Sequence, residues 1–139
     1  MDEPARPDVD RLGLEILPPD ECWELLANSP VGRRAFMDAG APEVFPVTHA
    51  VVGRRIVFRS AAGTKLGAAT MAPAVAFEVD AWDPPQRSGW SVVARGTAES
   101  APLDGQELDR LGLESWLTPA AEGTWIAILV DEISGRRLR

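Results

Sequence analysis

Three stretches rich in Val, Ile and Phe follow one another between residues 31 and 61, and only short turn signals separate them. The stretches read VGRRAFMDAG, EVFPVTHAVVG and RRIVFRSA, and the turn signals are DAGAP and VG. Parallel strands need a crossover connection of a dozen or more residues, and this region has no room for one. The sequence therefore predicts an antiparallel meander of three strands.

The rest of the chain supplies three more strands and three short helices. Strand alternation returns in AVAFEVDAW, WSVVARGTAESA and TWIAILVDEISGRRLR. Helices are predicted in PPDECWELLANSP, GTKLGAATMA and DGQELDRLGLE. Six strands joined by short connections favour a closed sheet, because closure removes exposed strand edges. The predicted fold class is mainly β, a six-stranded antiparallel β-barrel with short helices.

The third strand of the meander has two different faces. Ile56, Phe58 and Ser60 share one face, whereas Arg55, Val57 and Arg59 share the other. The second face must therefore tolerate charge. Other charged pairs are predicted to be solvated, and these are Arg33/Arg34, Arg54/Arg55, Arg136/Arg137 and Glu78/Asp80.

Length and charge limit the number of domains and the class of partner. A chain of 139 residues suits one domain, and residues 1–13 lack an apolar period, so they are expected to form a flexible arm before a single domain at 14–139. A net charge of −7 argues against nucleic acid. Without a long apolar run or a basic leader, the expected location is the cytoplasm, away from membranes. One Cys and one His give no basis for a transition-metal cluster.

The stretch RSAAGTKLGAA, residues 59–69, joins a predicted strand to a predicted helix. A glycine-containing turn of this kind offers backbone N–H groups and the positive end of a helix dipole. Arg59, Ser60, Thr64 and Lys65 add two cations and two hydroxyl groups, which suit a terminal phosphate. Local pattern also allows a simpler interpretation, in which Thr64 caps the helix and Arg59 and Lys65 are surface charges.

Several stretches in order give the chain a family resemblance across residues 17–137. They are ECWELLANSPVGRRAF, FPVTHAVVG, IVFRSAAGTKL, VAFEVD, GWSVVARGTAE and ISGRR. Together they resemble the pyridoxamine 5′-phosphate oxidase-like family of FMN-binding split β-barrels, in particular its small, divergent bacterial members. The resemblance implies a single split-barrel domain at 14–139, an FMN cofactor, and a homodimer with two FMN sites at its interface.

The resemblance also assigns residues to the flavin site. Beside the flavin ring it places Pro46, Val47, Thr48 and His49. At the FMN phosphate it places Arg59, Ser60, Thr64 and Lys65. Toward the flavin held mainly by the other subunit it places Trp90 and Ser91.

The implied activity is that of an FMN-dependent oxidoreductase acting on an unidentified small substrate. Oxidation of vitamin B6 is disfavoured, because no second cluster for a substrate phosphate is present. Two alternatives stay open: a flavin-binding or sensing module without turnover, and a relative that binds a deazaflavin or haem instead of FMN. No catalytic residue is assigned, since His49 suits either a role near the flavin or a structural hydrogen bond. Trp90 suits either core packing or contact with the flavin.

Overall fold

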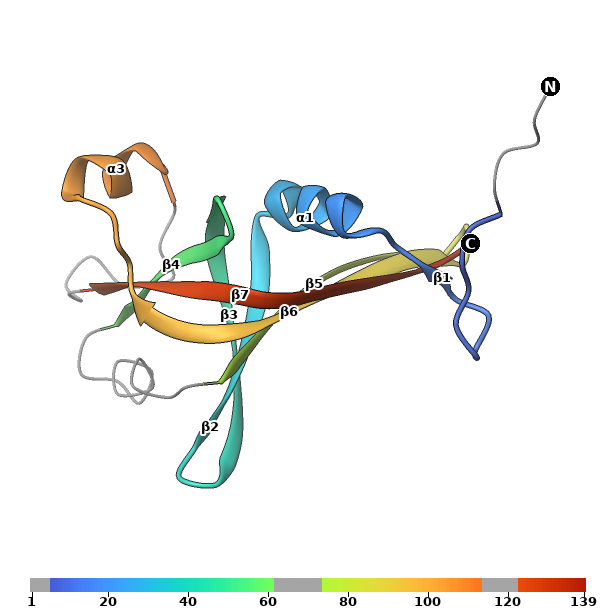
Figure 1. Ribbon diagram of the computed structural model, residues 1–139, viewed down its shortest axis with the longest axis horizontal. Helices are drawn as coiled ribbons and strands as arrows, with labels where there is room; N and C mark the ends of the chain where they lie inside the picture. Colours follow the sequence, from blue (N-terminus) through green and yellow to red (C-terminus); the bar gives the residue numbers. More distant parts are fainter. Residues whose placement is uncertain (1–5, 62–73, 114–122) are drawn as a thin grey trace.

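Six long strands close into a barrel in the computed structural model, which describes residues 6–61, 74–113 and 123–139 (Figure 1). The strands are β2 (Val31–Asp38), β3 (Ala41–Val52), β4 (Arg55–Ala61), β5 (Val75–Asp83), β6 (Ser88–Ser100) and β7 (Gly123–Leu138). The sheet order is β1-β7-β4-β3-β2-β5-β6, and β6 pairs back onto β7. All pairings are antiparallel, which confirms the predicted fold class. The sequence missed only the two-residue β1 (Glu15–Ile16), which pairs with the end of β7.

The β2–β3 hairpin extends away from the body of the barrel, as the cyan ribbon at the bottom of Figure 1 shows. Its turn is formed by Ala39 and Gly40, whose φ angles are 49° and 82°. Positive φ at both central residues matches the twist of the flanking strands. The DAGAP signal therefore marks a hairpin turn, as predicted.

The inner face of the barrel holds the main hydrophobic core. Its largest fully buried side chains include Phe58, Phe77, Ile56 and Ile126. Helix α1 (Pro19–Asn28) packs Cys22 and Leu26 into the same core. Cys22 is fully covered there and acts as a small core residue.

A second, smaller core lies on the outer face of β4 and β7. Val57 and Ala127 are fully buried there against Leu108 of helix α3 (Gly105–Arg110). The backbone N–H of Glu107 donates a 2.8 Å hydrogen bond to the Asp104 side chain, which caps the helix. Sequence alternation assigned Val57 to a charge-tolerating face, and the structure refines this because α3 covers the middle of that face. The predicted helix GTKLGAATMA lies outside the described residues.

The described part of the N-terminal segment lies against the C-terminal end of β7. The Asp10 carboxylate accepts hydrogen bonds from the backbone N–H groups of Leu12 and Leu14 and from Arg136. The flexibility of residues 1–13 and the domain boundary at residue 14 stay predictions. Neither helix in the described ranges is long and apolar enough to cross a membrane.

Candidate functional site

The segment of β3 predicted to lie beside a flavin presents alternate residues to opposite faces. Pro46 is exposed and Thr48 is half-buried on the outer face, where they pair with Arg33 and Val31 of β2. The intervening Val47 points into the core and is 4% exposed. A ligand on the outer face would therefore meet the side chains of Pro46 and Thr48, and only the backbone of the residues between them.

His49 lies on the inner face and is buried. Its Nε2 is 2.9 Å from the carbonyl oxygen of Leu26 on α1, and its ring meets the edge of Phe77 at 4.8 Å between centroids. Burial lowers the pKa of His49, because the interior disfavours the charged imidazolium. Of the two interpretations of this residue, the geometry favours the structural one, in which Nε2–H donates to the helix α1 carbonyl.

Arg59 is the exposed cation at the centre of the predicted phosphate site. It pairs with Trp125 of β7, and its guanidinium carbon lies 5.9 Å from the Trp125 ring centroid. No carboxylate pairs with Arg59 among the described residues. The backbone places Ser60 next along β4, paired with Thr124, whereas Thr64 and Lys65 lie outside the described residues.

Trp90 and Ser91 lie on β6, far from Arg59 across the sheet. Trp90 is half-buried, packs against the main core and also lines a cleft of about 510 Å³ with Trp82 and Arg137. Core packing of Trp90 is confirmed, and its contact with a flavin stays a prediction. Ser91 pairs with Asp80 of β5 and faces outward.

The registers of neighbouring strands place these residues in one row on the outer face. When the β3–β4 register is continued by one residue and the β2–β5 register by two, the row runs Arg59, Thr48, Val31, Asp80 and Ser91, on β4, β3, β2, β5 and β6 in turn. Three strand spacings of about 4.8 Å separate Thr48 from Ser91, so roughly 14 Å of sheet lies between them. Within one chain, the β3–β4 residues and the β6 residues therefore form two separate groups, called here the two half-sites of the predicted flavin site.

An ionic cluster that the sequence missed occupies the sheet between the two half-sites. Arg33 Nη1 lies 3.2 Å from Glu78 Oε1 and 3.2 Å from Asp80 Oδ2. Burial, followed by the neighbouring Asp80 carboxyl, raises the pKa of Glu78 to about 7, and Arg33 opposes this rise. The two acids were predicted to be simply solvated, and they instead bind one guanidinium across β2 and β5.

Arg34 is the second residue that the sequence misjudged. It is 7% exposed and its guanidinium lies over the Phe58 ring, 4.7 Å from the centroid. Its Nε and Nη1 have no hydrogen-bond partner among the described residues. Burial lowers the pKa of Arg34 to about 10, so the group is still charged at neutral pH. Alternation along β2 places Arg34 on the same face as Phe36, which was a usable signal.

The donor set at Arg59 suits an anionic ligand with a planar ring. An exposed guanidinium without an acid partner can donate hydrogen bonds to a phosphate. The outer surface of Pro46 and Thr48 lies one strand away. In the described ranges, no group of three or more His, Cys, Asp or Glu side chains could hold a metal ion.

Comparison with known proteins gives this arrangement a family. The family model described as pyridoxamine 5′-phosphate oxidase matches residues 18–137. The chain is 36% identical over 126 residues to the uncharacterised protein Rv0080 of Mycobacterium tuberculosis. The alignment covers 86% of this chain and 82% of that relative.

Two solved structures share both the fold and a substantial part of the sequence. The FAD-binding protein of Mycobacterium smegmatis is 33% identical, with a TM-score of 0.73 over 89% of this chain and 99% of its own. An FAD-binding protein of Mesorhizobium loti is 29% identical, with a TM-score of 0.75 over 91% and 99% of the two chains. The barrel, the family match and these relatives agree, and the chain belongs to the pyridoxamine 5′-phosphate oxidase-like family.

Proposed function

We propose that this protein binds a flavin at Arg59 and acts, as a homodimer, as an oxidoreductase on a small substrate. The observation that carries the proposal is the state of Arg59, which is exposed, stands beside Trp125 and has no acid partner among the described residues. A charge-assisted contact to a phosphate is worth about 1.5–3 kcal/mol. The turn that follows Arg59 in the sequence, with Ser60, Thr64 and Lys65, would supply the remaining phosphate contacts.

The separation of the two half-sites supports the dimer. Thr48 and Ser91 lie three strands apart on one barrel, too far for one flavin ring to contact both within a chain. A second chain, turned so that its β6 faces the first chain's β3, would bring Ser91 of the partner subunit to the flavin. Two such sites per dimer follow from twofold symmetry.

The form of the flavin is the next question. The sequence resemblance implies FMN, whereas the two relatives at 33% and 29% identity are named as FAD-binding proteins. Both forms carry the same ring and a phosphate at the same distance from it, so Arg59 suits either. When bound, the flavin supplies hydride or two-electron transfer, and the protein supplies binding and orientation.

The first experiment is the visible absorbance spectrum of the purified protein after addition of FMN or FAD and desalting. Retained flavin bands, with quenched emission from Trp125 beside Arg59, are the expected result. Reduction of the bound flavin by NADH or NADPH would then support turnover, and a tightly bound flavin that no reductant reaches would favour a binding or sensing module. A Soret band, or binding of a deazaflavin in place of flavin, would favour the exchanged cofactor.

Oligomeric state is tested in the same samples by light scattering. We expect a dimer at micromolar concentration, with a flavin stoichiometry of one per chain. A monomer that still binds flavin tightly would contradict the shared site.

A further inference from the structure

A groove of about 510 Å³ lies where the β2–β3 hairpin leaves the barrel. Its walls are mainly apolar, formed by Ala35, Met37 and Val44 of the hairpin and by Val75 and Ala76 of β5. Met37 and Val44 are more than half exposed. The volume lies within the range of small-molecule sites, roughly 300–1,000 Å³.

The far wall of the groove is a β-bulge between β6 and β7. Arg95 pairs with Glu132 and Gly96 pairs with Val130, so Asp131 is the extra residue. A Cβ at Gly96 would overlap the carbonyl oxygen of Leu129, so only glycine allows this approach of the two strands. The bulge thus turns charged side chains toward an otherwise apolar groove.

These charged side chains form no ion pairs with one another. Arg95, Asp131 and Glu132 line the groove, and none of the three takes part in an ion pair among the described residues. Glu43 lines the opposite side. Asp131 and Glu132 therefore outnumber Arg95, which favours a ligand with positive charge.

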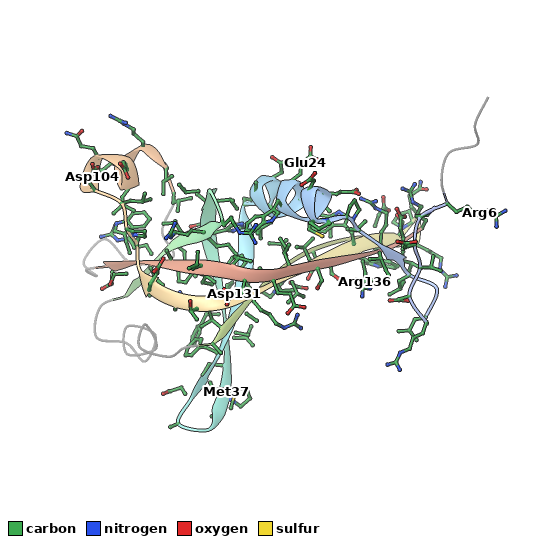
Figure 2. The ribbon with its side chains drawn as sticks, in the orientation of Figure 1. Arg6, Glu24, Met37, Asp104, Asp131 and Arg136 are labelled. Carbon is green, nitrogen blue, oxygen red and sulfur yellow. The ribbon has the colours of Figure 1, made fainter. Side chains whose placement is uncertain are left out.

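The groove begins next to the strand assigned to the flavin ring. Val44 is the outward-facing residue of β3 immediately before Pro46, and two residues of strand span about 7 Å. Figure 2 shows Met37 on the hairpin and Asp131 on β7, on the opposite side of the barrel from Glu24 on α1. A molecule in the groove would lie beside a flavin ring at Pro46 and Thr48.

We infer that this groove binds the substrate, and that the substrate is a small apolar molecule carrying a positive charge, such as a protonated amine. That the ligand is a substrate rests on the proposed function, whereas its chemical class is inferred from the groove alone. A second copy of the chain is the competing occupant, since the hairpin is exposed.

The test uses three probes with the same ring and different charge: 1-naphthylmethylammonium, 1-naphthylmethanol and 1-naphthylacetate. Their affinities are measured by titration calorimetry on the full chain, with and without flavin. We expect the ammonium probe to bind at least about tenfold more tightly than the acetate. The double variant Asp131→Asn/Glu132→Gln should lose most of that preference, and Ala76→Leu should weaken all three probes by filling the groove.

The matched control is Glu24→Gln/Asp109→Asn, which changes the net charge equally at exposed positions on the two helices. It should leave the preference unchanged. Equal or tighter binding of the acetate, no binding of any probe, or an equal loss in the control would each overturn the inference. Flavin retention in the same samples separates the two proposals: flavin without amine binding overturns only this inference, whereas amine binding without flavin overturns the redox role.

Discussion

Arginines that lie beside the two ends of β7 differ in whether an acid pairs with them. Near its start, Arg59 stands against Trp125 with no acid partner among the described residues. At its end, every arginine is paired: Arg136 with Asp10, Arg137 with Glu15 and Glu21, and Arg139 with Glu15. Arginines near the two ends of β7, one on the neighbouring strand β4 and the others at the C-terminal end of the chain, therefore have different environments.

The difference separates arginines whose charge is paired with an acid from one whose charge could bind a ligand. The paired arginines link the N-terminal segment and α1 to the barrel. Their charges are therefore neutralised by carboxylates of the same chain. Arg59 makes no such link among the described residues, and an exposed cation without an acid partner there can bind an anion. Under the proposed function, the arginines at the end of β7 serve stability and Arg59, beside its start, serves binding.

The largest expected effect is on flavin binding. Replacing Arg59 and Lys65 together by Ala removes two charge-assisted contacts to the phosphate and should weaken FMN or FAD binding by roughly 3–6 kcal/mol. The measurement is flavin affinity by fluorescence titration, with thermal unfolding followed in parallel. Arg6→Ala/Arg11→Ala, with the same loss of charge on the exposed N-terminal segment, should bind flavin normally. Unchanged affinity in the Arg59/Lys65 variant would remove the phosphate assignment.

The opposite result is expected at the other end of β7. Arg137→Ala removes the cation that Glu15 and Glu21 share and leaves Glu15 with the exposed Arg139, which should lower the free energy of unfolding by about 2–3 kcal/mol. Urea unfolding of the flavin-free chain measures this loss. Flavin affinity per folded chain should not change by more than about twofold. A large loss of affinity with normal stability would reverse the division between the two ends.

Sequence alone predicted most of the barrel because strand alternation is local. Each run from β2 to β7 shows its inner face as every second apolar residue, and the short connections left only antiparallel pairing. The resemblance placed Pro46, Val47, Thr48 and His49 together beside the flavin ring, and the structure shows that Val47 and His49 are buried whereas Pro46 is exposed and Thr48 half-buried. What it could not show was that α3 covers Val57, since that contact joins distant parts of the chain.

Charge pairing was the part of the site that the sequence could not predict. Arg33 meets Glu78 and Asp80 across 45 and 47 residues, and Arg137 meets Glu21 across 116. Each of these residues reads locally as a solvated charge. Only the strand order brings the partners together, so sequence could identify candidate cations at the site without showing which of them were already neutralised.

Arg34 represents a third situation, since it has neither an acid partner among the described residues nor exposure to solvent. Arg34 is buried over Phe58, and within the part of the chain that the structure describes two of its nitrogens have no hydrogen-bond partner and no acid pairs with it. Replacing a poorly satisfied buried charge by an apolar side chain is often stabilising. Arg34→Leu should therefore raise the free energy of unfolding by roughly 1–2 kcal/mol in urea. A loss of stability would show that Arg34 has an acceptor that the described residues do not include.

The smallest effect concerns how firmly Arg33 is paired. Burial and Asp80 raise the pKa of Glu78 from its ordinary 4.5 to about 7 in the folded chain. Between these two values the folded state binds more proton than the unfolded state, so this contribution is complete below about pH 4.5 and is lost as the pH rises through about 7. The stability of the native chain relative to Glu78→Gln should thus fall over that window, by less than about 1 kcal/mol because the carboxyls are partly exposed. Urea unfolding at about pH 5 and pH 8 measures the difference, and Glu24→Gln should follow the native curve. Parallel curves for the native chain and Glu78→Gln would mean that Arg33 cancels the rise in the pKa of Glu78 caused by burial and Asp80. The ion pair of Arg33 would then be as strong as that of Arg137.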